Sequence, residues 1–248
     1  MPVISEPRVP QIIAHRGYSA KYPEQTPVAF EEALKLPIYG IECDVQGTKD
    51  GHLAVIHDDV VDRVSNGTGA VADLTVSELL ELNFGTADNP QHIMVLEELL
   101  EMLEDYPDKS LLLETKHPSR FGGQIEHKVS EILTEKGLAA DPRINIISFD
   151  KTALDRAAEL LPDLDRCLLL NPHRSFSELV SEAGQTPTIL GPEVSWARQY
   201  PDVIGWQALN TYVWTVDDVE DLRWCRENQV PFLGTNDPEV ALQVFSNQ

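Results

Sequence analysis

Short apolar segments rich in β-branched residues alternate with amphipathic segments along this chain of 248 residues, and this alternation limits its possible folds more than any other feature. Strands that alternate with helices are typical of parallel sheets, because a helix forms the crossover from one strand to the next. Strands are expected at residues 11–14, 40–46, 110–116, 144–149, 166–170, 188–191, 212–216 and 230–235. Helices are expected at residues 28–34, 95–104, 121–136, 151–160, 176–183, 194–208 (irregular), 219–228 and 238–244.

Eight such units in a chain of this length predict an α/β fold, a TIM (β/α)8 barrel. An open, doubly wound sheet is the alternative, and it is disfavoured because no glycine-rich phosphate loop follows the first strand. Residues 59–93 are rich in turn signals and too long for a simple strand-to-helix connection. We expect them to form a small inserted segment over the barrel mouth, after the second strand, so that residues 1–248 make a single domain.

The acidic composition limits the partners of the chain. Its formal net charge is −22, which argues against nucleic acid but leaves room for a small phosphate substrate beside a local cation. No apolar run approaches the roughly 20 residues of a membrane span. Three widely spaced cysteines, Cys43, Cys167 and Cys225, and the lack of a signal-peptide pattern predict a reduced, cytoplasmic protein. Nothing in the sequence sets an oligomeric state.

The strand expected at residues 40–46 carries two carboxylates on one face. Residues two apart in a strand point the same way, so Glu42 and Asp44 should lie together, opposite the apolar face. Buried carboxylates repel each other unless a positive group lies between them, and a hard divalent cation prefers oxygen ligands. Glu114 follows three leucines in the next barrel strand and should also be buried. The sequence therefore indicates one divalent cation, Mg²⁺ or Ca²⁺, held by three carboxylates.

Further polar residues are expected at the same end of the barrel, where TIM-barrel active sites lie. His15 and Arg16 end the first strand, His57 ends the apolar run 53–56, and Lys116 lies two residues after Glu114. Each feature also has a purely structural interpretation. Glu114 with Lys116 could be a structural ion pair, a histidine could simply be exposed, and the acids could face helix N-termini or an arginine. Convergence of all seven residues on three neighbouring strands favours a functional site.

These residues belong to motifs that resemble the glycerophosphodiester phosphodiesterase family, from about residue 12 to residue 240. The matching motifs are His15-Arg16-Gly17, Pro23-Glu24-Gln25-Thr26, Glu42-Cys43-Asp44-Val45, His57-Asp58, Glu114-Thr115-Lys116, Val213-Trp214-Thr215-Val216 and Gly234-Thr235-Asn236-Asp237-Pro238. The chain departs from the family pattern at Gln25, where the family usually has asparagine. It departs again at Asn236, which stands between the threonine and the aspartate of the last motif. A longer amide at position 25 would shift the loop that carries Glu24.

The resemblance implies hydrolysis of a small-molecule glycerophosphodiester to an alcohol and glycerol 3-phosphate. It also implies a TIM barrel with a divalent cation on Glu42, Asp44 and Glu114, and a general acid and base at His15 and His57. Arg16 and Lys116 match the phosphate-contacting positions of the family, and Glu24 matches its loop glutamate near the site. Trp214 and Tyr18 are candidate walls of the substrate pocket, although either could equally belong to the core.

Several alternatives stay open at this stage. The glycerol 2-hydroxyl could attack first and form a cyclic phosphate that is then hydrolysed, or water could attack directly. A related lyase would stop at the cyclic phosphate. A non-catalytic barrel that binds a polyol phosphate is a further alternative, and it is disfavoured because binding alone requires no pair of histidines.

Overall fold

The computed structural model describes residues 9–171, 173, 178 and 186–246. Its strands run, in chain order, over β1 Gln11–His15, β2 Gly40–Gly47, β3 Leu53–Val55, β4 Met94–Val95, β5 Ser110–Thr115, β6 Ile144–Ser148, β7 Asp165–Leu170, β8 Ile189–Pro192, β9 Asn210–Val213 and β10 Phe232–Thr235. Its helices run over α1 Pro27–Leu34, α2 Val76–Leu80, α3 Leu96–Glu104, α4 Gln124–Glu135, α5 Lys151–Leu160, α7 Val194–Gln199, α8 Val219–Glu227 and α9 Pro238–Ser246. Short 3-10 turns cover Val71–Asp73, Pro201–Val203 and Trp206–Ala208.

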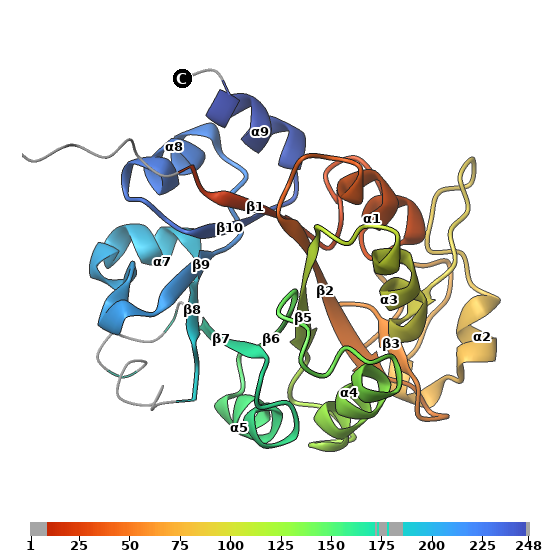
Figure 1. Cartoon of the computed structure of the whole chain (residues 1–248). Helices are drawn as coiled ribbons and strands as arrows, with labels where there is room; N and C mark the ends of the chain where they lie inside the picture. The colour runs from red at the N-terminus through yellow and green to blue at the C-terminus, as the bar shows by residue number, and fades with distance from the viewer. Residues whose placement is uncertain (1–8, 172, 174–177, 179–185, 247–248) are drawn as a thin grey trace, which may run out of the picture.

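Within these described residues, eight parallel strands close a barrel in the order β1, β2, β5, β6, β7, β8, β9, β10, and β10 pairs back onto β1. Figure 1 shows the strands around a central axis with helices outside them. The predicted TIM barrel is therefore confirmed. The helix expected at residues 176–183 falls almost entirely outside the described residues. The irregular helix expected at 194–208 divides into α7 and two 3-10 turns.

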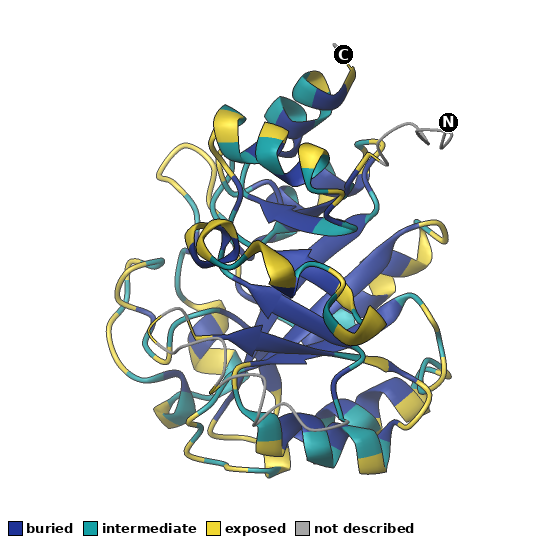
Figure 2. Cartoon of the chain, turned by 90° about the vertical axis from the view of Figure 1, so that its left-hand side faces the viewer, coloured by how far each residue is buried: buried dark blue, intermediate teal, exposed yellow. Residues whose placement is uncertain are grey.

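Two packed layers follow from the alternation of side chains along each strand. Ile41, Cys43 and Val45 of β2 face the outer helices and belong to the large core between strands and helices. A second core fills the barrel interior. It contains Ile13, Leu112, Ile147, Cys167, Leu169, Ile189 and Tyr212. Figure 2 shows the buried strands inside the molecule and the exposed residues on the outer turns and helices.

Two short strands flank the segment inserted after β2, residues 59–93: β3 precedes it and β4 follows it. β3 pairs antiparallel with the end of β2, and β4 pairs with β3. A separate core lies beneath the segment, and Ala54, Ile56, Val61, Val71, Leu79, Phe84 and Ile93 make it up. Helix α2 begins after Thr75, whose hydroxyl accepts from the backbone N–H of Glu78 in a capping box. It ends at Leu80.

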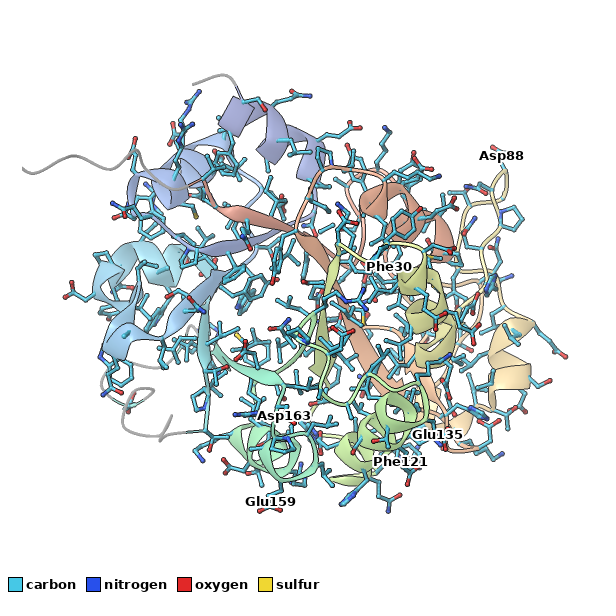
Figure 3. The ribbon with its side chains drawn as sticks, in the orientation of Figure 1. Phe30, Asp88, Phe121, Glu135, Glu159 and Asp163 are labelled. Carbon is cyan, nitrogen blue, oxygen red and sulfur yellow. The ribbon has the colours of Figure 1, made fainter. Side chains whose placement is uncertain are left out.

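The negative charge is spread over the outside of the molecule. Asp88 on the inserted segment and Glu159 on α5 lie at the edge of the molecule in Figure 3, and Glu135 at the end of α4 and Asp163 after α5 are also exposed. Phe30, by contrast, is fully buried in the outer core. Across residues 9–171 and 186–246, none of the helices combines the length and the apolar character that a membrane span requires.

Candidate active site

The predicted site residues of β1, β2 and β5 meet at the carboxyl ends of these neighbouring barrel strands, whereas His57 follows the antiparallel strand β3 and Trp214 follows β9. His15 of β1 is in register with Glu42 of β2, and Asp44 of β2 is in register with Glu114 of β5. All four side chains point into the barrel, because they lie on the same faces of the strands as Ile13 and Leu112, which pack in the barrel interior. The parallel register therefore brings together residues that are far apart in the sequence.

The turn after β1 fixes the first of these residues. Arg16 has a φ of 59° and Gly17 a φ of 77°, so the chain turns sharply at the end of the strand. A side chain at Gly17 would place its Cβ 2.7 Å from the backbone of Ala29, so glycine is required there. The turn directs the backbone N–H of Arg16 to Oε2 of Glu42, at 3.0 Å.

Glu42, Asp44 and Glu114 form the most strongly charged part of the site. All three are buried, and one oxygen from each lies within 4.8 Å of the others. Burial, together with the charges of the neighbouring acids, raises the pKa of Glu42 well above its ordinary value and that of Glu114 to about 8. Glu42 and Glu114 thus resist ionisation beside Asp44, and three buried carboxylates that offer only oxygen atoms fit a hard divalent cation.

Two cations and an amide contact these acids. Lys116 Nζ lies 2.8 Å from Glu114 Oε1 and 3.2 Å from Asp44 Oδ1, so the Glu114–Lys116 ion pair that the sequence left open is present. Arg16 Nε lies 3.5 Å from Asp44 Oδ2, and Gln25 Nε2 donates to that same oxygen at 2.5 Å. Burial opposes the ionisation of Asp44, but Lys116 and Arg16 outweigh it and lower its pKa.

His15 is held by a residue that sequence reasoning left without a role. His15 Nδ1 lies 2.8 Å from Asn236 Oδ1, and Asn236 Nδ2 donates to Asp217 Oδ2 at 2.6 Å. A carboxylate only accepts hydrogen bonds, so Asp217 fixes the amide with its oxygen toward His15. His15 Nδ1 must therefore carry the proton. Its Nε2 then remains available and lies 3.9 Å from Glu42 Oε2.

His57 has a comparable arrangement built from different residues. Its Nδ1 lies 2.6 Å from Asp58 Oδ1, and Arg63 Nε donates to Asp58 Oδ2 at 2.6 Å. The hydrogen bond from Arg63 helps to hold the pKa of Asp58 well below its usual range, so this carboxylate is an acceptor. His57 Nδ1 therefore carries the proton, as in His15. Burial lowers the pKa of both histidines, so both imidazoles are neutral at pH 7 in the ion-free protein.

The cavity above these residues has a polar side and an apolar side. Its volume is about 110 Å³, and His15, His57, Glu42, Glu114, Arg16 and Lys116 form the polar side. Phe149, Leu169 and Trp214 form part of the apolar side. The Trp214 indole donates from Nε1 to the Gly191 carbonyl at 2.8 Å, and its ring meets Phe149 edge-on. Tyr18, the other candidate wall, belongs instead to the outer core.

A larger open hollow of about 590 Å³ adjoins the cavity and shares His15 and Arg16 with it. Glu24 lies in this hollow, and its Oε1 accepts from Arg16 Nη1 at 3.0 Å. The two spaces together can accommodate a small phosphodiester.

Comparison with known proteins identifies the family. The glycerophosphoryl diester phosphodiesterase family model matches residues 15–240. The chain belongs to this family. A probable glycerophosphodiester phosphodiesterase 1 of Mycobacterium tuberculosis is 35% identical, over 92% of this chain and 90% of the relative. A glycerophosphodiester phosphodiesterase of Caldanaerobacter subterraneus is 31% identical, over 94% and 96%. The family membership predicted from the motifs is thus confirmed.

Solved structures of the same fold agree with this assignment. The glycerophosphodiester phosphodiesterase of Thermotoga maritima has a TM-score of 0.74 and 27% identity, covering 97% of this chain and 99% of that one. A phosphodiesterase of Oleispira antarctica, solved with the product sn-glycerol-3-phosphate, has a TM-score of 0.85 and 23% identity, covering 96% and 98%. The likeness to the Oleispira structure supports the barrel fold alone.

Four residues of the site were not predicted to act there: Gln25, Asp58, Arg63 and Asn236. Asp58 and Asn236 stand inside quoted motifs, and their places beside His57 and in the last motif were the available signals. Gln25 was noticed only as a departure from the family pattern. Arg63 had no signal, because its contacts with Glu24 span 39 positions of sequence.

Proposed function

We propose that this protein hydrolyses glycerophosphodiesters to an alcohol and glycerol 3-phosphate. Membership of the glycerophosphoryl diester phosphodiesterase family supports the reaction class. The observation that carries the proposal is the pair of imidazoles, His15 and His57. Each has its Nδ1 hydrogen-bonded to a fixed oxygen, and both line the cavity that contains Glu42 and Glu114. A binding protein would require no such pair.

One divalent cation, Mg²⁺ or Ca²⁺, would be held by Glu42, Asp44 and Glu114. When bound, it supplies positive charge to the phosphoryl oxygens and so lowers the energy of the transition state. Arg16 and Lys116 would add to this charge by contacting the phosphate. Lys116 now lies against Asp44 and Glu114, and its flexible stem lets the ammonium group turn from these acids to a substrate oxygen.

His15 and His57 would act as general acid and base. Both are neutral in the ion-free protein, yet the reaction requires one of them to carry a proton to the leaving alcohol. A phosphodiester in the cavity brings a negative charge beside them, which favours protonation of one imidazole. The other can then take a proton from the attacking hydroxyl group through its Nε2. The glycerol 2-hydroxyl and water remain alternative nucleophiles.

The remaining contacts orient the substrate. Glu24 would hold the guanidinium of Arg16 at the edge of the cavity, since Arg16 Nη1 donates to its Oε1 at 3.0 Å. Trp214 would pack against the glycerol carbons, and its orientation is fixed by the hydrogen bond to Gly191. The leaving alcohol would occupy the open hollow beside His15.

The proposal extends to the setting of the protein. Residues 1–248 would act as one barrel domain, with residues 59–93 as an inserted part of it. The protein would work in the cytoplasm, in line with three free, buried cysteines. Its partner would be a small-molecule phosphodiester and not nucleic acid, since the formal charge of −22 opposes a polyanion.

A hydrolysis assay tests this proposal. Several glycerophosphodiesters should release glycerol 3-phosphate with Mg²⁺ or Ca²⁺ and none with a chelator, and phosphorus NMR would reveal a cyclic phosphate if the protein were a lyase. His15→Ala and His57→Ala should each lower kcat by about 10²-fold. His92→Ala is the matched control, because His92 also contacts a carboxylate, Glu98, but is exposed. Wild-type protein that hydrolyses none of these diesters with any divalent ion would refute the proposal.

A further inference from the structure

A continuous line of charged contacts crosses the mouth of the barrel and joins His57 to Arg16. It runs from His57 to Asp58, then to Arg63, Glu24 and Arg16. His57 and Asp58 follow β3, whereas Arg16 and Glu24 belong to the loop after β1. Arg63, from the inserted segment, is the member of this line that touches both loops.

The guanidinium of Arg63 uses its planar shape for this contact. Nη1 and Nη2 donate to the two oxygens of Glu24, at 2.8 and 2.9 Å, and Nε donates to Asp58 Oδ2 at 2.6 Å. A paired contact with one carboxylate and a single contact with another needs a rigid fork of N–H groups. A lysine ammonium is a compact charge and cannot reproduce this arrangement.

Each acid held by Arg63 also contacts a residue of the proposed catalytic machinery. Asp58 gives one oxygen to Arg63 and the other to His57 Nδ1, at 2.6 Å. Glu24 Oε1 accepts from both Arg63 and Arg16. Without Arg63, two neighbouring carboxylates would face each other across the mouth and repel. Asp58 could then rotate away from His57, and Glu24 away from Arg16.

The backbone beneath Arg63 is well supported, so its side chain can be changed without loss of the segment. Val61 is fully buried in the core of the inserted segment, and Val64 packs against that core. The backbone N–H of Val61 donates to the Gly69 carbonyl at 3.0 Å. The Arg63 side chain is 48% exposed. Ion pairs at such exposure contribute little to folding stability.

We infer that Arg63 is a positioning residue that holds His57 and Arg16 in their mutual arrangement across the active site. This inference rests on the proposed function for its effect on rate, but its effect on His57 can be measured without turnover. It also assigns the inserted segment a part in catalysis, because the segment supplies the residue that joins the two catalytic loops.

The test compares Arg63→Lys and Arg63→Ala with the wild type. Both variants should lower kcat by about 10-fold or more, since small misplacements of catalytic groups have effects of this size. Arg63→Lys should have this lower kcat even though lysine retains the positive charge. The melting temperatures of both variants should stay close to that of the wild type. Added guanidinium should raise kcat of Arg63→Ala but not of the wild type. Arg120→Ala is the matched control, because Arg120 also forms an ion pair with this segment, through Asp73, and its side chain is more exposed than that of Arg63.

Nitrogen NMR of the imidazoles gives a second readout that needs no activity. His57 should carry its proton on Nδ1 in the wild type and populate both tautomers in Arg63→Ala, while His15 keeps the Nδ1–H form. An unchanged His57 spectrum together with wild-type kcat in both variants would overturn the inference. A fall in kcat that accompanies a matching fall in melting temperature, without guanidinium rescue, would also overturn it. A wild type that is inactive but shows the predicted NMR change would contradict the proposed function and support the positioning role.

Discussion

Removing the divalent ion should make the folded protein lose stability as the pH rises. Glu42, Asp44 and Glu114 hold oxygens within 4.8 Å of one another. At an effective dielectric constant of about 20, two unit charges at that distance repel by about 3.5 kcal/mol. The ion-free site therefore keeps protons, and burial with the charge of Asp44 raises the pKa of Glu114 to about 8. The unfolded chain releases the same protons near pH 4.5, the ordinary value for glutamate.

The sign of the effect follows from proton linkage. Between these two pKa values the folded state binds more protons than the unfolded state, so the free energy of unfolding falls as the pH rises. For one retained proton, the free energy of unfolding falls by about 1.4 kcal/mol per pH unit. From about pH 5.5 to about pH 7.5 the loss is roughly 2.7 kcal/mol. For a protein of this size, that corresponds to a fall of roughly 5–11 °C in melting temperature.

Calorimetry with and without chelator measures this effect. Mg²⁺ or Ca²⁺ at about 100 times its Kd should restore about 2.7 kcal/mol and remove most of the pH dependence, because the ion binds the ionised carboxylates. Glu114→Gln is the control variant: it should lose the share of this pH dependence that Glu114 contributes, and most of the stabilisation by the ion. Equal melting temperatures with chelator and with millimolar Mg²⁺ and Ca²⁺ would refute the three-carboxylate site. So would an undiminished ion effect in Glu114→Gln.

Three other predictions concern single residues. Glu126 accepts hydrogen bonds from His117 and Arg156, and these contacts outweigh burial and lower its pKa. Glu126→Gln should therefore lower the free energy of unfolding by roughly 3 kcal/mol near pH 7, and by less as the pH falls below about 4.5. Denaturant titration near pH 7 and below about pH 4.5 checks this. Asn236→Ala leaves the His15 imidazole without its acceptor and should lower kcat by about 10-fold, measured in the diester assay. Trp214→Ala should raise KM more than it lowers kcat in the same assay, because Trp214 lines the apolar side of the cavity and, in the proposed complex, would pack against the substrate away from the reacting atoms.

Local patterns in the sequence predicted the barrel and the orientation of its acids. The alternation in β2 was enough to place Glu42 and Asp44 on one face, since a strand has a period of two residues. Helix α5 spans Lys151–Leu160 as predicted, with the Asp150 side chain capping it. Strand ends were less predictable. β9 ends at Val213 and not at residue 216, because Trp214 and Val216 bond to β8 and β10 outside a regular ladder.

The supporting contacts of the site depend on tertiary structure, and local patterns carry little information about them. Asn236 and His15 are 221 positions apart, and they meet only because β10 pairs with β1 to close the barrel. The motif comparison marked Asn236 as a departure from the family pattern, but it gave no reason for the change. In the structure, the Asn236 side chain accepts the hydrogen bond from His15, and Asp217 fixes the amide so that its oxygen faces the imidazole.

The unequal lengths of β1 and β2 explain why an antiparallel strand, β3, precedes the inserted segment. β1 ends at His15, opposite Glu42, whereas β2 continues to Gly47 and pairs with β5 along its other edge. The free edge of β2 beyond Glu42 is then covered by β3, which pairs with it from Val45 onward. An uncovered edge would leave buried backbone groups without partners. His57 follows this strand directly, so β3 both covers the edge of β2 and places a proposed catalytic residue at the mouth of the barrel.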